Sequence, residues 1–354
     1  MVSLLVFQQR LYGVFMKRIR LRFAGFEIGF VDRERALKQV FEWGEKGTWH
    51  PVVVFGPEGC GKTTWLRQSV EILKGLGYEV FYIHPLDRIV YAELSMQSVK
   101  EIFLSFVQKA FAEEAPTRIA WALFDFVREV LRVRRSRVAV LADDIFHVIG
   151  VKNSAIYVKG ILNMIEHPIY DYEKIVAIIA TSEGVSRWVI GRHRWADIMP
   201  MWNMSRKGFE ELYEQIQKKV SCNISSFEDV WRLAGGNPEI FAQLCQANCN
   251  VDVVIERLIK MKQLTREFIK RWEYYLNEAV DNPDSLWEKD VPNELRRALI
   301  RRNLIVYDMY DRNPIFWVDD PPLEMGSELG IGRYVAWQTP LHREAVKRAL
   351  KKYK

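Results

Sequence analysis

The sequence contains few cysteines. Four occur among 354 residues: Cys60, Cys222, Cys245 and Cys249. So few thiols exclude a disulfide-stabilised scaffold and fit a reducing compartment. Cys245 and Cys249 are spaced to share one face of a helix, but the sequence offers no further Cys or His near them. We therefore expect two small buried side chains there and no metal site.

Long apolar runs are also missing. The longest, such as Ile175–Ala180, fall far short of the ~20 residues that a membrane-spanning helix needs. The first ten residues, MVSLLVFQQR, lack the small-residue cleavage site of a signal peptide. We expect a cytoplasmic protein with no membrane partner.

Excess charge of one sign is confined to one end of the chain. The sequence has 51 Lys and Arg against 45 Asp and Glu, a net charge of +6. Residues 341–354 alone hold six bases and one acid, so the rest of the chain is close to neutral. This excludes a polybasic nucleic-acid coat, although a basic terminal helix could contact phosphate.

Short apolar runs alternate with segments of helical spacing in the first two thirds of the chain. After a strand within Lys17–Phe23, the expected strands are Trp49–Phe55, Glu79–His84, Arg137–Ala142, Ile175–Ala180 and Ala196–Met201. The expected helices are Asp32–Gly44, Gly61–Leu76, Gln97–Glu114, Pro116–Val133 and Asn153–His167. Such alternation predicts an α/β fold, a parallel sheet between two helical layers, over residues 25–204. Residues 1–24 are an N-terminal extension.

The sequence pattern changes after residue 204. Residues 205–262 have the spacing of helices, with Arg206–Val220 and Ser226–Ile259 broken at Gly235–Pro238. Residues 263–354 follow the order of a winged helix. The expected elements there are a helix Thr265–Ala279, a basic helix Pro292–Arg302, strands Leu304–Tyr310, Ile315–Asp319 and Val335–Gln338, and a final basic helix.

The most specific signal is the octet G-x-x-x-x-G-K-[ST], which lies between an expected strand and an expected helix. Its residues are Gly56, Pro57, Glu58, Gly59, Cys60, Gly61, Lys62 and Thr63, followed by Thr64. Glycines let successive N–H groups point inward at an anion, and the positive end of the following helix adds to this field. Lys62 supplies a charge for the β and γ phosphates. The Thr63 hydroxyl is a ligand that Mg²⁺ prefers.

Two acids supply the second half of such a site. Asp143 and Asp144 follow the expected strand Arg137–Ala142, and ligands of parallel sheets bind at the carboxyl ends of strands. We expect Asp143 to hold Mg²⁺, and Asp144 to polarise an attacking water. The complete strand Glu79–His84 between the phosphate loop and Asp143 predicts that the strand before the loop and the Asp143 strand are not neighbours.

Two further candidates follow the strand Ile175–Ala180. Thr181 could sense the γ-phosphate or simply cap the following loop or helix. Arg187, before Arg192 and Arg194, could neutralise phosphoryl charge or belong to a solvated loop.

The order GPEGCGKT, VLADDIF, AIIATSEG and LAGGNPEIF resembles an archaeal-type P-loop ATPase of the STAND branch of the AAA+ group. The resemblance implies a P-loop NTPase core with a three-layer αβα arrangement, a helical lid and a winged helix. Phe30–Leu37 resembles the family motif F-x-G-R-E-x-E-L near the adenine, with Asp32 at the glycine position. It implies contacts of Val31 and Arg33 with ATP or ADP, and Gly236–Pro238 implies packing of Pro238 by the base.

One departure bears on the rate of hydrolysis. Many AAA+ motors carry Glu where this chain has Asp144, whose side chain is one methylene shorter. Asp-Asp also occurs in signalling members of the STAND branch, which implies slow hydrolysis and a switch.

Three functions remain open. The first is a Mg²⁺-dependent slow ATPase that acts as a nucleotide-controlled switch, with a protein partner or nucleotide-dependent homo-oligomer. The second is a DNA-binding ATPase related to origin-recognition proteins, which holds double-stranded DNA through Asn293–Arg302 and the basic C-terminus. The third is a nucleotide-bound scaffold without activity.

Overall fold

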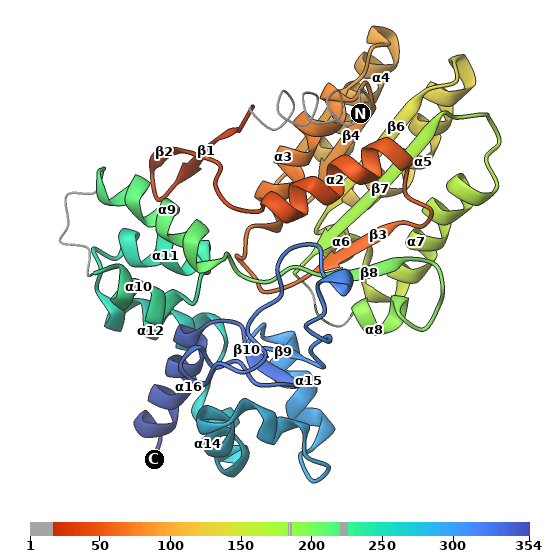
Figure 1. The fold of residues 1–354 in the computed structure, drawn as a ribbon. Helices are drawn as coiled ribbons and strands as arrows, with labels where there is room; N and C mark the ends of the chain where they lie inside the picture. Colours follow the sequence, from red (N-terminus) through yellow and green to blue (C-terminus); the bar gives the residue numbers. More distant parts are fainter. Residues whose placement is uncertain (1–16, 183, 185, 220–225) are drawn as a thin grey trace. The chain divides into compact units, whose positions relative to one another are not determined.

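The structure is a computed structural model, which describes residues 17–182, 184, 186–219 and 226–354. The chain forms two compact units (Figure 1). The first contains residues up to 19, 34–55 and 62–199, and the second contains 20–33, 56–61 and 200–354. Most of the predicted N-terminal extension and Cys222 lie outside the described residues. No helix of the described chain is long and apolar enough to span a membrane.

A six-stranded sheet forms the centre of the first unit. Its order is β5 (Ile89–Glu93), β4 (Glu79–His84), β6 (Arg137–Asp143), β7 (Lys174–Thr181), β3 (Val52–Phe55) and β8 (Asp197–Pro200). The pairs β4–β6, β6–β7 and β7–β3 are parallel, which confirms the predicted α/β class. β7 separates β3 from β6, as predicted. The antiparallel edge strand β5 was not predicted, because its half-exposed sequence lacks a buried apolar run.

Helices cover both faces of this sheet (Figure 1). Alternate strand residues such as Phe81, Val140 and Ile179 join one core cluster with α4 (Gln97–Ala112), α5 (Pro116–Val133) and α7 (Val151–Glu166). The intervening residues lie on the opposite face, where α2 (Glu34–Lys46) and α3 (Lys62–Gly75) pack. Because β4, β6 and β7 are almost entirely buried, charged side chains occur only at their ends.

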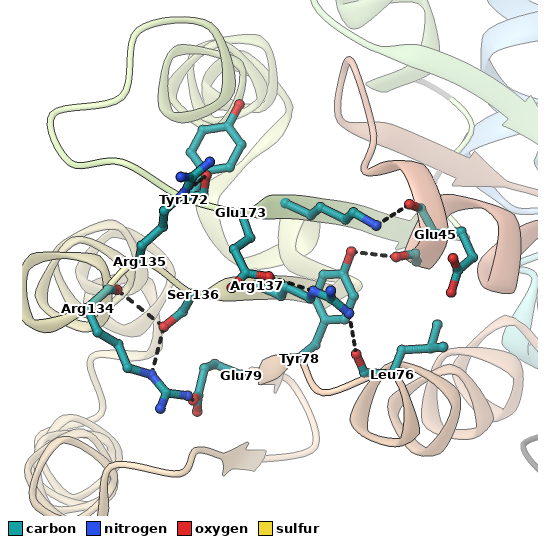
Figure 2. A network of polar contacts seen from close by, with 12 residues as sticks. Glu45, Leu76, Tyr78, Glu79, Arg134, Arg135, Ser136, Arg137, Tyr172 and Glu173 are labelled. Atoms are coloured by element: carbon teal, nitrogen blue, oxygen red, sulfur yellow. Dashed lines mark hydrogen bonds and ion pairs between the residues drawn. The ribbon is translucent and has the colours of Figure 1, made fainter.

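A polar network closes the end of the sheet where β4, β6 and β7 begin (Figure 2). The Arg137 guanidinium binds Glu173 at 2.9 Å and donates to the Leu76 carbonyl at 3.1 Å. Arg134 binds the buried Glu79 carboxylate at 2.9 Å. The Tyr78 hydroxyl donates to the carbonyl of Gly44 at 2.8 Å and so ties the start of β4 to α2.

Helices dominate the second unit. They are α9 (Arg206–Gln217), α10 (Phe227–Ala234), α11 (Pro238–Gln246) and α12 (Val251–Met261). Ser205, Ser226, Asn237 and Asn250 begin them as N-caps, each accepting from the third residue on. The hairpin of β1 (Arg20–Phe23) and β2 (Phe26–Gly29) contacts α9, where the Gly29 amide donates to Gln215 Oε1 at 2.9 Å.

The C-terminal part differs from the prediction in two elements. Its helices are α13 (Arg266–Arg271), α14 (Glu273–Asp281), α15 (Asn293–Arg301) and α16 (Pro340–Lys352). The single predicted helix Thr265–Ala279 is wrong, because the chain leaves helical geometry at Trp272. The predicted strand Ile315–Asp319 is also wrong: Asn313 caps a short 3₁₀ helix, Pro314–Phe316. β9 (Ile305–Tyr307) pairs with β10 (Val335–Trp337).

We predict that Tyr78→Phe lowers the free energy of unfolding by about 1 kcal/mol, since it leaves the Gly44 carbonyl without its donor. The matched control is Tyr157→Phe on α7. The Tyr157 hydroxyl is buried and has no hydrogen-bond partner among the described residues, so its removal should cost nothing. Urea unfolding of both variants measures the difference. Equal losses would refute the assignment.

Candidate functional site

The candidate site of the first unit lies at the carboxyl edge of the sheet. β4, β6 and β7 end there at His84, Asp143 and Thr181. α3 begins at Lys62, directly after the glycine-rich stretch 56–61. Parallel strands bring their last residues to one edge, which is the usual ligand edge of such sheets.

Asp143 is the most buried acid of this edge, with 1% of its surface exposed. Its Oδ2 accepts a hydrogen bond from the Tyr82 hydroxyl at 3.1 Å and lies 3.8 Å from His84 Nε2. The Thr63 side chain also hydrogen-bonds this carboxylate. Burial and the charge of Asp144 raise the pKa of Asp143 to about 6. Thr63, Tyr82 and His84 act in the opposite direction and lower it.

Asp144 has an unusual backbone. Its φ of +47° is left-handed, and it stands at the start of the short helix α6 (Ile145–Ile149). Its Oδ1 accepts from the amide and the hydroxyl of Ser182, at 3.0 and 3.1 Å. The structure thus links the predicted acid to the end of β7, next to Thr181.

The other candidates of this unit are buried. Lys62 and Thr181 are 6% and 1% exposed, respectively. Arg187, in α8 (Ser186–Ile190), is also buried, and its guanidinium lies 4.7 Å from the centre of the Phe55 ring. The alternative of a solvated Arg187 is therefore wrong, whereas Arg192 and Arg194 are exposed.

The donors at this edge fit a hard divalent cation. Thr63 offers a hydroxyl, and Asp143 and Asp144 offer carboxylates, which are oxygen ligands that Mg²⁺ prefers. His84 could complete a three-residue metal group, because ligand atoms of His84, Asp143 and Asp144 lie within 4.8 Å of one another. However, His84 Nδ1 accepts from the Asp87 amide at 3.1 Å. A neutral His84 then carries its proton on Nε2 and is a donor toward Asp143.

The loop 56–61 belongs to the second unit, where glycine is required at three places. Gly61 has φ +101°. A Cβ at Gly56 would lie 1.9 Å from the Met201 carbonyl oxygen, and one at Gly59 would lie 2.2 Å from the Glu239 Cβ. Neither contact is compatible with a side chain, so both positions require glycine.

The Gly236–Pro238 element contacts this loop. Asn237 is fully buried, and its Nδ2 donates to the Glu58 carbonyl at 2.9 Å and to Asn203 Oδ1 at 2.8 Å. Its Oδ1 caps α11, whose first residue is Pro238. The predicted role of Pro238 beside a base stays a prediction.

The segment before α2 contains a left-handed turn at Asp32. Asp32 stands where the family motif has glycine and has φ +65°. Its carboxylate accepts from the Ser205 amide and hydroxyl, both at 2.9 Å, which stabilises this left-handed turn. Arg33 binds Asp319 at 2.7 Å and donates to the Cys60 carbonyl. Contacts of Val31 and Arg33 with a nucleotide stay predictions.

Glu58 has contacts that the sequence did not reveal. Its carboxylate accepts from Lys262 Nζ at 2.5 Å and from Asn303 Nδ2 at 3.2 Å, and its amide donates to Gln338 Oε1 at 2.9 Å. Although burial acts in the opposite direction, Lys262 holds the pKa of Glu58 below its ordinary value. No local pattern signals partners this distant in sequence.

The contacts of Tyr82 and His84 with Asp143 were not predicted either, although the sequence contained a pattern that indicates them. The strand Glu79–His84 was predicted with its end at His84, and the rule that placed Asp143 at the ligand edge applies equally to that strand.

We predict that Asp143→Asn abolishes Mg²⁺-dependent nucleotide binding and stabilises the ligand-free protein at pH 7. The pKa of folded Asp143 is about 6, above the unfolded value of about 3.9. The folded state therefore binds the extra proton between these values, and its stability falls as pH rises through that window. Removing the charge should add about 1–3 kcal/mol at pH 7.

The test is thermal unfolding at pH 4 and pH 7, with Asp125→Asn on the exposed face of α5 as the control. A gain at pH 7 that shrinks at pH 4 supports the assignment. Destabilisation at pH 7 contradicts it.

Several solved structures are similar to this chain at low sequence identity. The Walker-type ATPase of Pyrococcus abyssi is 13% identical to this chain, with a TM-score of 0.47. The match covers 90% of this chain and 96% of the Pyrococcus abyssi chain. DnaA of Aquifex aeolicus bound to AMPPCP is 16% identical over 71% of this chain and 69% of its own, with a TM-score of 0.36. A RuvB variant of Thermotoga maritima is 13% identical over 79% and 85%, with a TM-score of 0.37.

No protein of curated function matches the chain. A family model does match: the ATPase domain predominantly from Archaea covers residues 30–244, more than half of the sequence. The match includes the loop 56–61, Lys62, Asp143 and Asp144, the residues whose geometry is described above. The chain therefore belongs to this predominantly archaeal family of ATPase domains, which bind adenine nucleotides.

Proposed function

We propose that this ATPase is a slow, Mg²⁺-dependent enzyme that works as a nucleotide-controlled switch. The observation that carries the proposal is the set of contacts at Glu58. A residue inside the phosphate-binding motif is bound by Lys262, Asn303 and Gln338. These partners come from the regions that we predict to be the helical lid, 205–262, and the winged helix, 263–354.

Different residues would bind the phosphates and the metal ion. The N–H groups of the loop and the start of α3 would bind the phosphates of ATP or ADP, with Lys62 as their counter-charge. Thr63 and Asp143 would hold Mg²⁺. When bound, this ion neutralises phosphate charge. The left-handed glycine Gly61 and the buried Lys62 support this assignment.

Asp144 is our candidate for orienting the attacking water. Ser182 fixes one of its carboxylate oxygens, Oδ1, through two hydrogen bonds, and we assign Oδ2 to the water. Because the Asp side chain is one methylene shorter than Glu, it reaches the water less well, and we expect slow hydrolysis. Thr181 and Arg187 are proposed to sense the transferred phosphoryl group.

The switch follows from competition at Glu58. Its amide cannot donate fully to a phosphate and to Gln338 Oε1 at once. The Glu58 carboxylate also repels phosphate, so a bound phosphate should move it away from Lys262 and Asn303. Binding of ATP should therefore change the contacts of Lys262 and Gln338, and by reciprocity those contacts should change the affinity for ATP.

We predict that the purified protein hydrolyses ATP in single turnover more slowly than about 1 s⁻¹. Lys62→Ala should reduce this rate about 100-fold or more, because the charge opposite the phosphates is lost. Phosphate release after rapid mixing measures both rates. Faster turnover would contradict the switch, and bound nucleotide without any phosphate release would indicate a scaffold.

We predict that Lys262→Ala changes the affinity for ATP about fivefold, since it removes a partly exposed ion pair. The control is Lys260→Ala, an exposed lysine in the last turn of α12, the helix that ends directly before Lys262. Titration with a fluorescent ATP analogue compares the two variants. An unchanged affinity in Lys262→Ala would contradict the coupling.

DNA binding is the second candidate function. Arg297 and Arg301 are exposed on α15, beside a pocket of about 520 Å³ that Arg271 and Arg302 also line. Other basic side chains have partners within the chain. Arg296 donates to the carbonyls of Leu286 and Glu288. On α16, Arg348 and Lys352 form ion pairs. We rank DNA second for this reason.

The turnover assay separates the two functions when it is repeated with duplex DNA at low and high salt. Stimulation that falls steeply with salt supports the DNA-binding ATPase. Turnover indifferent to DNA favours the switch, with a protein partner or a nucleotide-dependent homo-oligomer as its readout.

A further inference from the structure

We propose that Tyr82 and His84 are positioning residues of the metal site. Tyr82 donates a hydrogen bond to Oδ2 of Asp143, and His84 Nε2 lies beside the same oxygen, so that the carboxylate presents its other oxygen, Oδ1, to the divalent cation. This inference rests on the proposed function, because it assumes that Asp143 is the metal-side acid.

The sheet itself brings Tyr82 to Asp143. β4 and β6 are parallel neighbours, and Tyr82 lies opposite Leu141. Tyr82, Leu141 and Asp143 share one face by strand alternation, the face on which α3 packs. The Tyr82 hydroxyl donates to Asp143 Oδ2 at 3.1 Å, and its buried ring stacks on Tyr91 with centres 4.6 Å apart.

Packing fixes the Tyr82 ring. The side chain is fully buried, and its ring stacks on that of Tyr91 in β5. The direction of the hydroxyl toward Asp143 Oδ2 is therefore set by the packed ring.

His84 is the second donor. The strand register continues from Ile83 opposite Ala142, which puts His84 opposite Asp143. The Asp87 amide donates to His84 Nδ1 at 3.1 Å and so leaves the proton on Nε2. Nε2 lies 3.8 Å from Asp143 Oδ2 and 3.6 Å from Asp87 Oδ2. The first distance exceeds a hydrogen bond and should shorten in the loaded site.

Hydrogen bonds to one oxygen of the Asp143 carboxylate leave the other oxygen available to a metal ion. A carboxylate has two oxygens with several acceptor sites, and its terminal torsion is soft. Contacts to Oδ2 restrict this torsion without occupying Oδ1. Groups that orient a metal ligand in this way typically change metal affinity or activity by 10- to 100-fold when they are removed.

The variants are chosen to separate positioning from packing. Tyr82→Phe removes the hydroxyl and keeps the ring. His84→Ala removes the second donor, and His84→Gln restores an N–H near the position of Nε2. Tyr157→Phe is the matched control, a buried hydroxyl on α7 with no partner among the described residues.

The readout is Mn²⁺ affinity, measured by electron paramagnetic resonance in the presence of a non-hydrolysable ATP analogue. The Mg²⁺ concentration that gives half-maximal ATP turnover is the second readout. We expect Tyr82→Phe and His84→Ala to weaken Mn²⁺ binding about tenfold and to raise the Mg²⁺ requirement. His84→Gln should recover most of the affinity, and Tyr157→Phe should match the wild type.

Two failures are distinguishable. If the wild type binds Mn²⁺ with the analogue and Tyr82→Phe and His84→Ala bind it equally well, the positioning role is wrong and the metal site stands. If the wild type binds no Mn²⁺ under these conditions, the proposed function itself fails, and the inference fails with it. Near-ultraviolet circular dichroism of each variant shows whether its fold is intact.

Discussion

The structure depends on one constraint: a charged carboxylate must sit at the end of a strand that is buried along its whole length. β4, β6 and β7 contain almost no exposed residue, so a charge in their middle would be desolvated without compensation. The carboxyl edge is the first place where polar groups can emerge. Asp143 is still only 1% exposed there. This burial raises its pKa, and the nearby Thr63, Tyr82 and His84 act in the opposite direction. A bound cation would supply the remaining compensation.

The phosphate loop, residues 56–61, is stabilised by backbone packing and by side chains from distant parts of the sequence. Its glycines are required by close backbone approaches and by left-handed φ values. It is held by side chains that are far apart in sequence: Arg33 binds the Cys60 carbonyl, Asn237 binds the Glu58 carbonyl, and Gln338 binds the Glu58 amide. The contacts of Arg33 and Asn237 use carbonyl oxygens, which a phosphate cannot bind, whereas the Gln338 contact uses the Glu58 N–H group, which a phosphate could also bind. Competition at this one amide is suited to a protein whose output depends on which nucleotide is bound.

The sequence reveals those parts of the site that depend on local pattern. The octet Gly56–Thr63 and the acids after Arg137–Ala142 are local patterns, and the roles assigned to their residues stay predictions. The strand Glu79–His84 and the helix Pro116–Val133 were predicted with their observed bounds. The edge strand β5 was not predicted, because a half-exposed strand has no distinct period. Lys262, Asn303 and Gln338 could not be predicted, since only the folded chain brings them to Glu58.

The central claim is that nucleotide binding and the contacts of Glu58 exclude one another. Hydrogen–deuterium exchange tests it directly, with peptides that cover the loop 56–61, Asn303 and Gln338, measured without ligand and with a non-hydrolysable ATP analogue and Mg²⁺. We predict that the loop becomes protected while the peptides containing Asn303 and Gln338 exchange faster. Protection of the loop with unchanged exchange in both C-terminal peptides would contradict the claim.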